Sequence, residues 1–164
     1  MKPSEGPYEY AALAGLDPKH YTILLHGIDV SCCKCGLTPE IPDLEGLNLA
    51  VAVQIALRSR IEGTALRFLR KVLGSSQEEF GSWIDVKGAR ISQLEGESSE
   101  LPPRLSVFLR LHVLRKLGHL RHAQRPLSLP ARDLIEGLLE PPKDSKKSEF
   151  LRGANGWVAL EQPS

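Results

Sequence analysis

Apolar residues recur at helical spacing through the middle of the chain and predict a succession of helices. A strongly apolar helix is expected between residues 46 and 60, and a second spans roughly residues 63–73, with Gly74 after it. Two short helices follow within residues 76–95. A long helix then begins at Pro102 and Pro103, where proline is tolerated in the first turn, and it ends at Gly118. This part of the chain is therefore predicted to be all-helical.

Residues 76–95 have the features of a helix, a sharp turn and a second helix. Ser76 can accept hydrogen bonds from free backbone donors of the first turn, and Glu79 three residues later completes a capping box. Gly81 permits close approach of the two helices, and Asp85 falls at the turn, where a positive φ is often required. The pattern predicts a helix-turn-helix.

The long helix is expected to bury one apolar side. That side consists of Leu105, Phe108, Leu109, Leu114 and Leu117. Arg110, Arg115 and Lys116 are expected largely outside it.

Residues 1–45 differ from the rest, because strand formers alternate there with glycine and proline. Residues 21–31 predict two short strands around a turn at His26 and Gly27, and residues 157–160 predict a terminal strand. The predicted fold class is α+β, mainly α. The predicted domains are a small β-rich domain at 1–45, a linker helix at 46–60, the helix-turn-helix domain at 61–118 and a C-terminal extension at 119–164.

The three cysteines lie together between residues 32 and 35. Cys32 and Cys35, followed by Gly36, have the spacing of half a zinc knuckle, in which backbone amides point at both sulfur atoms. His20 and His26 could complete a site with two cysteines and two histidines. The alternatives are a knuckle without metal and a buried cluster of thiols.

Composition is ordinary for a soluble globular protein, with 41% hydrophobic and 25% charged residues among 164. No apolar run has the length of a membrane span, the N-terminus does not resemble a signal peptide, and the cysteines form no secreted disulfide framework. A cytoplasmic location without membrane contact is expected. The sequence contains no hydrolase triad and no phosphate-binding glycine loop, so we do not expect an enzyme.

Charge is uneven along the chain, although the net charge is only +1. Residues 1–57 carry −4, residues 58–90 carry +3, and residues 104–125 carry +6 without any acidic residue. This asymmetry favours a nucleic-acid surface on the helical part and a different partner for residues 1–45. A solvated helical face is the simpler alternative.

Residues 62–74, followed by Ser76-Gln77-Glu78-Glu79-Phe80, resemble the helix-turn-helix of phage repressors of the Cro/Xre type. Within that group the stretch is most similar to bacterial MqsA-type antitoxins and related regulators. Residues 25–28 before the Cys-x-x-Cys also resemble the second half of the zinc domain of these antitoxins. That domain holds its metal with four cysteines in two pairs, whereas residues 1–20 here contain no cysteine.

The resemblance implies a five-helix, repressor-like domain that binds double-stranded DNA, with the second helix of the motif in the major groove. Gln77 is expected where the first motif helix meets the DNA backbone. The positions expected to face the groove are Lys87, Gly88, Ala89, Arg90, Ser92 and Gln93. Arg90 suits guanine, and Gln93 suits adenine. A phosphate contact or an intramolecular salt bridge is the alternative role of Arg90.

The expected function is therefore a transcriptional regulator, a dimeric repressor and the candidate antitoxin of a toxin–antitoxin pair. In the antitoxin, residues 1–45 would bind the toxin protein, or alternatively would only complete the core against the linker helix. The alternative function is an adaptor or toxin-neutralising protein whose helix-turn-helix no longer reads DNA. Apolar segments around Leu134, Leu138 and Trp157 could supply the homodimer interface.

Overall fold

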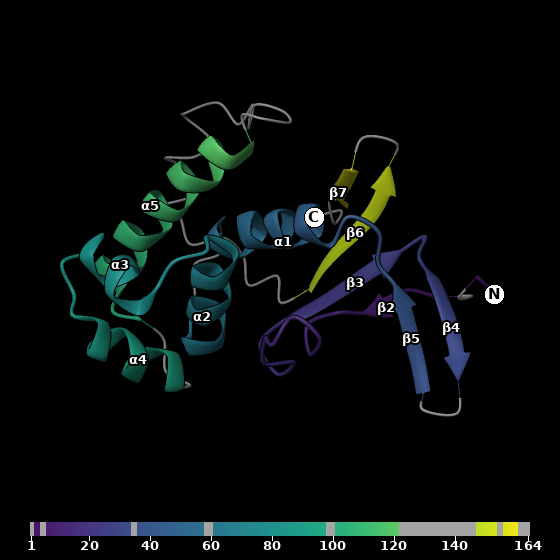
Figure 1. Cartoon of the computed structure of the whole chain (residues 1–164), viewed down its shortest axis with the longest axis horizontal. Coiled ribbons are helices and arrows are strands. Elements are labelled where there is room, and N and C mark those ends of the chain that lie inside the picture. Colours follow the sequence, from purple (N-terminus) through teal and green to yellow (C-terminus); the bar gives the residue numbers. More distant parts are fainter. Residues whose placement is uncertain are drawn as a thin grey trace. The chain divides into compact units, whose positions relative to one another are not determined.

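The computed structural model describes residues 2–3, 6–33, 36–57, 61–97, 101–121, 147–153 and 156–160. Over these residues the chain is α+β. It divides into two compact units, one formed by Met1–Val51 with Ser145–Ser164 and the other by Ala52–Asp144. All strands of the described residues belong to the first unit, and helices α2 to α5 belong to the second (Figure 1).

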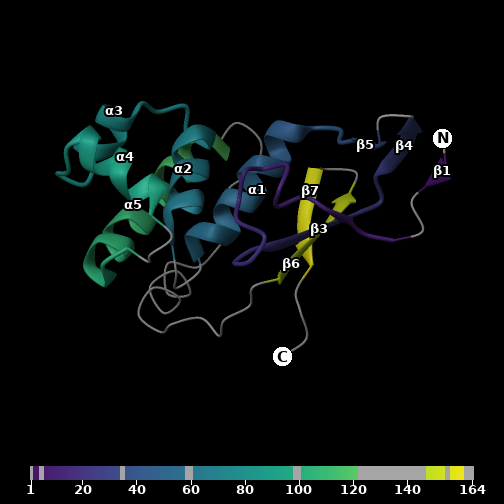
Figure 2. The same ribbon diagram turned by 90° about the horizontal axis from the view of Figure 1, so that it is seen from below.

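The first unit contains two small sheets. Strands β1 (Lys2–Pro3), β4 (Asp29–Cys33) and β5 (Gly36–Glu40) form one sheet in the order β1-β4-β5. Strands β2 (Tyr8–Glu9), β3 (Thr22–His26), β6 (Lys147–Gly153) and β7 (Gly156–Leu160) form the other in the order β2-β3-β6-β7. The β3–β6 pair is parallel and the other pairs are antiparallel, and β6 lies beside β3 in both ribbon views (Figures 1 and 2).

Alternating residues of the four-stranded sheet build the core of the first unit. Ile23 and Leu25 on β3 and Phe150 on β6 are almost completely buried. Because side chains of a strand alternate between faces, the intervening residues Leu24 and Leu151 lie on the opposite face. The two strands predicted around His26 and the strand predicted at residues 157–160 are confirmed, but β3 and β4 enter different sheets.

The observed units differ from the predicted domains. Residues 119–164 were expected as an extension, whereas β6 and β7 complete the sheet of the N-terminal segment. The cause is a parallel pairing between β3 and a strand more than a hundred residues later, which leaves no local signal in the sequence. The sequence also predicts a short amphipathic helix at residues 129–139, which lies outside the described residues.

Helix α1 (Leu44–Leu57) confirms the predicted apolar helix and begins slightly earlier than expected. Its start is set by Asp43, which has a φ of 53° and accepts a hydrogen bond from the N–H of Gly46 at 3.0 Å. This contact satisfies a donor in the first turn of the helix. Helix α1 starts in the first unit and ends in the second.

The second unit packs helices α2 (Gly63–Val72), α3 (Gln77–Ser82), α4 (Gly88–Gly96) and α5 (Pro103–Arg121) around one apolar core. The largest fully buried side chains of these helices are Leu66, Leu69, Phe80, Ile91, Leu109 and Leu117. Each comes from a position at helical spacing from its neighbours, so the predicted α-helical pattern is confirmed here.

Helix α5 differs from the sequence prediction in its buried face. Phe108, expected inside, is 57% exposed, whereas Arg110, expected outside, is 3% exposed. The buried positions are Ser106, Leu109, Arg110, Val113, Leu114 and Leu117, which follow one helical stripe. Apolar residues occur on every side of this helix, so the pattern alone left the orientation ambiguous. The helix also continues past Gly118 to Arg121.

The burial of Arg110 has a specific partner. Its Nε donates a hydrogen bond to the carbonyl oxygen of Ala56 at 2.6 Å, near the C-terminal end of α1. Carbonyl groups at that end lack partners within the helix and carry partial negative charge, so a guanidinium stabilises them. Burial lowers the pKa of Arg110 from its ordinary value.

Candidate functional site

The start of α3 is fixed by the predicted capping box. The hydroxyl oxygen of Ser76 accepts a hydrogen bond from the N–H of Glu79 at 3.1 Å, and the carboxylate of Glu79 accepts one from the N–H of Ser76 at 2.9 Å. Two backbone donors that the helix cannot satisfy internally are thereby paired. A cap of this kind contributes about 1 kcal/mol to helix stability.

The turn between α3 and α4 is closed tightly around Gly81. The carbonyl oxygen of Gly81 accepts hydrogen bonds from the N–H groups of Ile84 and Val86 at 3.1 and 2.9 Å. A Cβ atom at Gly81 would overlap the carbonyl oxygen of Val86, so the predicted close approach is confirmed. Asp85 has a φ of 54°, as predicted for this turn. These constraints fix the direction in which α4 leaves α3.

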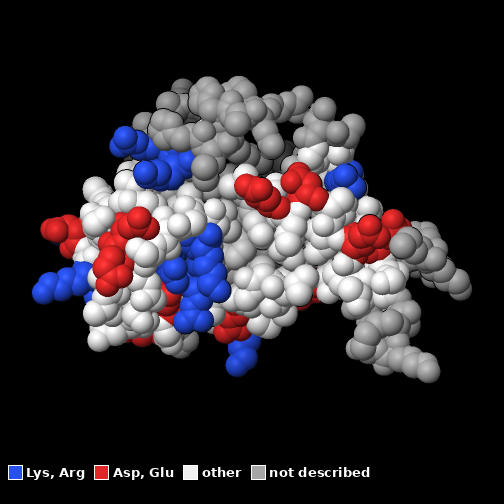
Figure 3. Space-filling view, in the orientation of Figure 1, with Lys and Arg blue, Asp and Glu red and all other residues white. Residues whose placement is uncertain are grey.

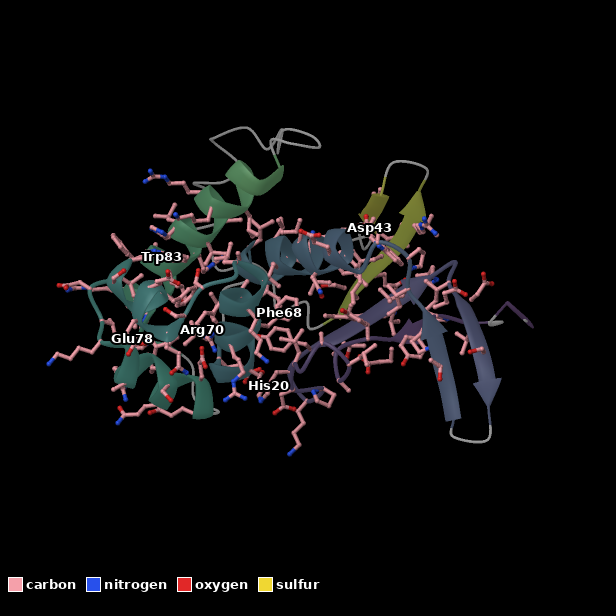
Figure 4. The ribbon with its side chains drawn as sticks, viewed as in Figure 1. His20, Asp43, Phe68, Arg70, Glu78 and Trp83 are labelled. Atoms are coloured by element: carbon pink, nitrogen blue, oxygen red, sulfur yellow. The ribbon has the colours of Figure 1, made fainter. Side chains whose placement is uncertain are left out.

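Trp83 connects this turn to α5. Its ring stacks on His112 with centroids 4.7 Å apart and lies 5.2 Å from the ring of Phe80. The ammonium of Lys116 lies 5.0 Å from the centre of the Trp83 ring, within range of a cation–π interaction. Figure 4 labels Trp83 next to α5. Trp83 thus packs the turn against Phe80 of the core and against His112 and Lys116 of α5.

A buried carboxylate, Glu95, ties together α2, α3 and α4. Its oxygens accept hydrogen bonds from Arg70 of α2, at 2.5 Å from Nε and 3.1 Å from Nη2, and from the amide nitrogen of Gln77 of α3 at 3.0 Å. Arg67 Nε lies 3.6 Å from the same carboxylate, whose side chain is 1% exposed. Figure 4 shows Arg70 pointing from α2 toward α4. The bidentate pair of Arg70 and Glu95 is a strong, directional contact.

The apolar pattern of α2 predicts Arg67, Arg70 and Lys71 on the face opposite its buried residues, and sequence reasoning assigned no role to Glu95. The signal was present, because Glu95 lies four residues after Ile91 and Arg70 lies four residues after Leu66. Both charged residues therefore occupy positions at the spacing of the buried residues. A glutamate and an arginine at core-facing positions of neighbouring helices predict a buried ion pair.

Acid is expected to destabilise the second unit. Burial raises the pKa of Glu95. The hydrogen bonds from Arg70 and Gln77 lower this pKa, and on balance the pKa of Glu95 is below its ordinary value. Its contribution to stability is therefore complete above the pKa of the unfolded chain, about 4.3, and is lost as pH falls through the lowered value. Burial, Lys116 and Arg115 also lower the pKa of His112, whose contribution is lost as pH falls below about 6.5.

Urea unfolding followed by helical circular dichroism at about pH 7, 5.5 and 3 tests this expectation. The midpoint should fall at each step. The variant His112→Gln should remove the first decrease and leave the second. A midpoint that stays constant down to about pH 3 would contradict both assignments.

The exposed face of α4 carries most of the residues predicted to face the groove. Ala89, Arg90, Ser92 and Gln93 are exposed on this helix, and Lys87 is exposed at its N-terminal cap. Arg90 Nη1 lies 3.2 Å from the amide oxygen of Gln93 and 3.2 Å from a carboxylate oxygen of Glu97. The exposed face of α4 is polar, and Arg90 and Gln93 lie side by side on it. The opposite side of α4 is buried in the core through Ile91 and Leu94.

Two predicted site residues lie elsewhere. Gly88 is buried, and a Cβ atom there would come within 3.0 Å of the carboxylate of Glu78, so Gly88 packs α4 against α3 instead of lying on the exposed face. Gln77 is half-buried at the first residue of α3, where its side-chain amide is used by Glu95. Gln77 therefore positions α3 relative to α4.

Basic side chains also occur on α2 and α5. Arg67 and Lys71 of α2 are exposed, and Figure 3 shows Lys and Arg atoms gathered over α2 and separately over α5. The first turn of α3 carries the exposed acids Glu78 and Glu79, which complement the positive end of that helix. Between the start of α2 and the end of α4, the exposed basic side chains are Arg67, Lys71, Lys87 and Arg90.

The proposed zinc ligands are only partly described. The backbone of Cys32 lies in β4 opposite Leu37, whereas Cys35 is outside the described residues. His26, suggested as a further ligand, instead lies 2.8 Å from the carboxylate of Glu149, and His20 lies 4.0 Å from that of Asp17. No group of three potential metal ligands occurs among the described residues. His20 and His26 therefore each lie beside a carboxylate, and a zinc site at Cys32 and Cys35 stays a prediction.

Comparisons with models of protein families, with curated proteins and with solved structures found no match to this chain. No helix of the described residues is long and apolar enough to cross a membrane.

Proposed function

We propose that the chain is a sequence-preferring DNA-binding regulator in which α3, the turn and α4 act as a helix-turn-helix. In this proposal α2 to α5, with the end of α1, form a repressor-like domain, and α4 enters the major groove. The observation that carries the proposal is the exposed polar face of α4, formed by Ala89, Arg90, Ser92 and Gln93 on a helix fixed by the core and by Glu95. A groove-reading helix requires both a free polar face and a rigid base.

The residue types on this face suit base edges. The planar guanidinium of Arg90 can donate two hydrogen bonds to guanine O6 and N7, and the amide of Gln93 can pair with adenine N6 and N7. Ala89 can contact the methyl group of thymine. To do so, Arg90 must leave Glu97, an exposed partner that contributes at most about 1 kcal/mol.

Phosphate contacts would come from cations around α4. Lys87 at its start and Arg67 and Lys71 on α2 are exposed and can pair with the DNA backbone. Glu78 and Glu79 would repel phosphate, which favours a docking position that keeps the start of α3 away from the strands. Regulation of transcription, by repression of a promoter, follows from occupancy of such a site.

Binding to duplex DNA should weaken when the α4 face is removed. The double variant Arg90→Ala/Gln93→Ala should bind the best duplex selected by the wild-type protein at least about tenfold more weakly, because each base contact contributes about 1–3 kcal/mol. Fluorescence anisotropy with the full-length chain over a series of salt concentrations measures the affinity and its salt dependence.

The matched control is Arg152→Ala, which removes one exposed arginine from the first unit. It should leave affinity for the selected duplex unchanged. Equal affinities of the wild type and the double variant, with the fold intact by circular dichroism, would refute the assignment of α4.

A further inference from the structure

Strand β7 forms one edge of the four-stranded sheet in the described part of the chain. Among the described residues it pairs only with β6, so one row of its backbone N–H and C=O groups has no strand partner there. Its sequence, Gly156-Trp157-Val158-Ala159-Leu160, contains neither a charged residue nor proline, and its register with β6 runs without a bulge. Charges, prolines and bulges are the usual devices that keep an edge strand from pairing with another chain.

Other edges of the first unit carry such devices. Strand β5, at the edge of the three-stranded sheet, contains Pro39 and Glu40. Strand β2, at the opposite edge of the four-stranded sheet, has only two residues, includes Glu9 and follows Pro7. Strand β1, the other edge of the three-stranded sheet, contains Lys2 and Pro3, so among the described edge strands β7 alone lacks such a device.

The sheet face next to this edge carries three exposed apolar side chains beside Glu149, the cross-strand neighbour of Leu160. Val158 is 58% exposed, its cross-strand neighbour Leu151 is 43% exposed, and Leu160 is 39% exposed. The opposite face of β7 packs into the core. Trp157 is buried there, and its indole N–H donates hydrogen bonds to the carbonyl oxygens of Pro42 and Asp43. The side chain of Trp157 is therefore used within the first unit, whereas the expectation that the segment around Trp157 supplies a dimer interface stays a prediction, because the backbone edge of β7 remains available among the described residues.

We propose that β7 pairs with β7 of a second copy of this chain, in antiparallel orientation about Val158. A two-fold axis there places Val158 opposite Val158, Trp157 opposite Ala159, and Leu160 opposite Gly156, and it joins the two sheets into one. The strand carries no charge, so an identical strand meets no like-charge repulsion. Val158 adds a β-branched pair at the centre.

A second copy is favoured over an unrelated strand by its relation to the proposed function, on which this choice of partner rests. Two-fold pairing of a DNA-binding chain doubles the number of base pairs that it reads and matches palindromic sites. The same edge could accept a strand from another protein, which the experiment distinguishes.

Sedimentation equilibrium of the full-length chain tests the interface without DNA. The wild type should be dimeric, and Val158→Lys should raise the dimer dissociation constant at least about tenfold, because a lysine on an edge blocks strand pairing. Leu13→Lys is the matched control, since Leu13 is 60% exposed and lies outside the strands. It should leave the constant unchanged. A monomeric wild type, or equal constants for both variants, would overturn the proposal.

Crosslinking gives a second, geometric readout. In a chain with Cys32, Cys33 and Cys35 replaced by serine, Val158→Cys should form a disulfide-linked dimer on mild oxidation, since opposed residues of an antiparallel pair are close enough for a disulfide. Leu13→Cys in the same background should not. Equal crosslinking of the two positions would overturn the two-fold pairing.

The interface and DNA binding can fail separately. Val158→Lys should retain the affinity of wild type for a duplex with one half-site and lose at least about tenfold on a duplex with two. Arg90→Ala/Gln93→Ala should remain dimeric by sedimentation. A wild-type dimer that does not bind DNA would support the β7 interface and refute the proposed function. A wild-type monomer that binds DNA would support the proposed function and refute the β7 interface.

Discussion

Replacement of Glu95 by alanine is expected to destabilise the second unit by about 3–5 kcal/mol. The reason is that Arg70, which is mostly buried, would keep its charge and lose the carboxylate that pairs with it. Gln77 would lose the same acceptor. Urea unfolding followed by circular dichroism at a helical wavelength measures the change, since the helices α2 to α5 lie in the second unit.

Glu97→Ala is the matched control for this variant. Glu97 lies two residues later and also pairs with an arginine, but the side chains of Arg90 and Glu97 are 51% and 41% exposed. Solvent screens such a pair, so its loss should change stability by less than about 1 kcal/mol. Similar losses for Glu95→Ala and Glu97→Ala would mean that the buried cluster does not hold the three helices together.

Gly81→Ala is the second change with a large expected effect. The added methyl group would overlap the carbonyl oxygen of Val86, which is backbone and cannot rotate away. Overpacking of this kind destabilises by about 1–3 kcal/mol, and here it would also displace α4 from α3. Unfolding by urea reports the loss of stability, and DNA binding by the folded variant reports the displacement.

Gly96→Ala provides the opposite expectation at another helical glycine. A Cβ atom at Gly96 would have no atom of the rest of the fold within 4 Å, so alanine should stabilise α4 by roughly 0.5–1 kcal/mol. If Gly81→Ala proved as stable as Gly96→Ala, the close approach of the two helices would not constrain the turn.

Features set by neighbouring residues could be predicted from the sequence. The capping box of Ser76 and Glu79, the glycine contact at Gly81 and the positive φ of Asp85 each depend on a few adjacent positions, and all three occur in the structure. Helix α1 could also be predicted, because its apolar residues lie close together in a single short segment.

Features set by distant residues could not be predicted in this way. The pairing of β3 with β6 joins segments whose individual patterns carry no information about register. The burial of Arg110 and the exposure of Phe108 follow from where the end of α1 lies, since the carbonyl of Ala56 receives the guanidinium. Gly88 was assigned to the exposed face by resemblance, and its contact with Glu78 depends on how α4 packs on α3.

The most direct test of DNA recognition by α4 is selection of duplexes from a randomised library by the full-length chain. The proposal predicts that wild type enriches one sequence pattern containing guanine, read by Arg90, while Arg152→Ala enriches the same pattern. It also predicts that Arg90→Ala/Gln93→Ala loses preference at the positions those side chains read. Failure of the folded wild-type protein to enrich any pattern, or enrichment of an identical pattern by the double variant, would contradict the account.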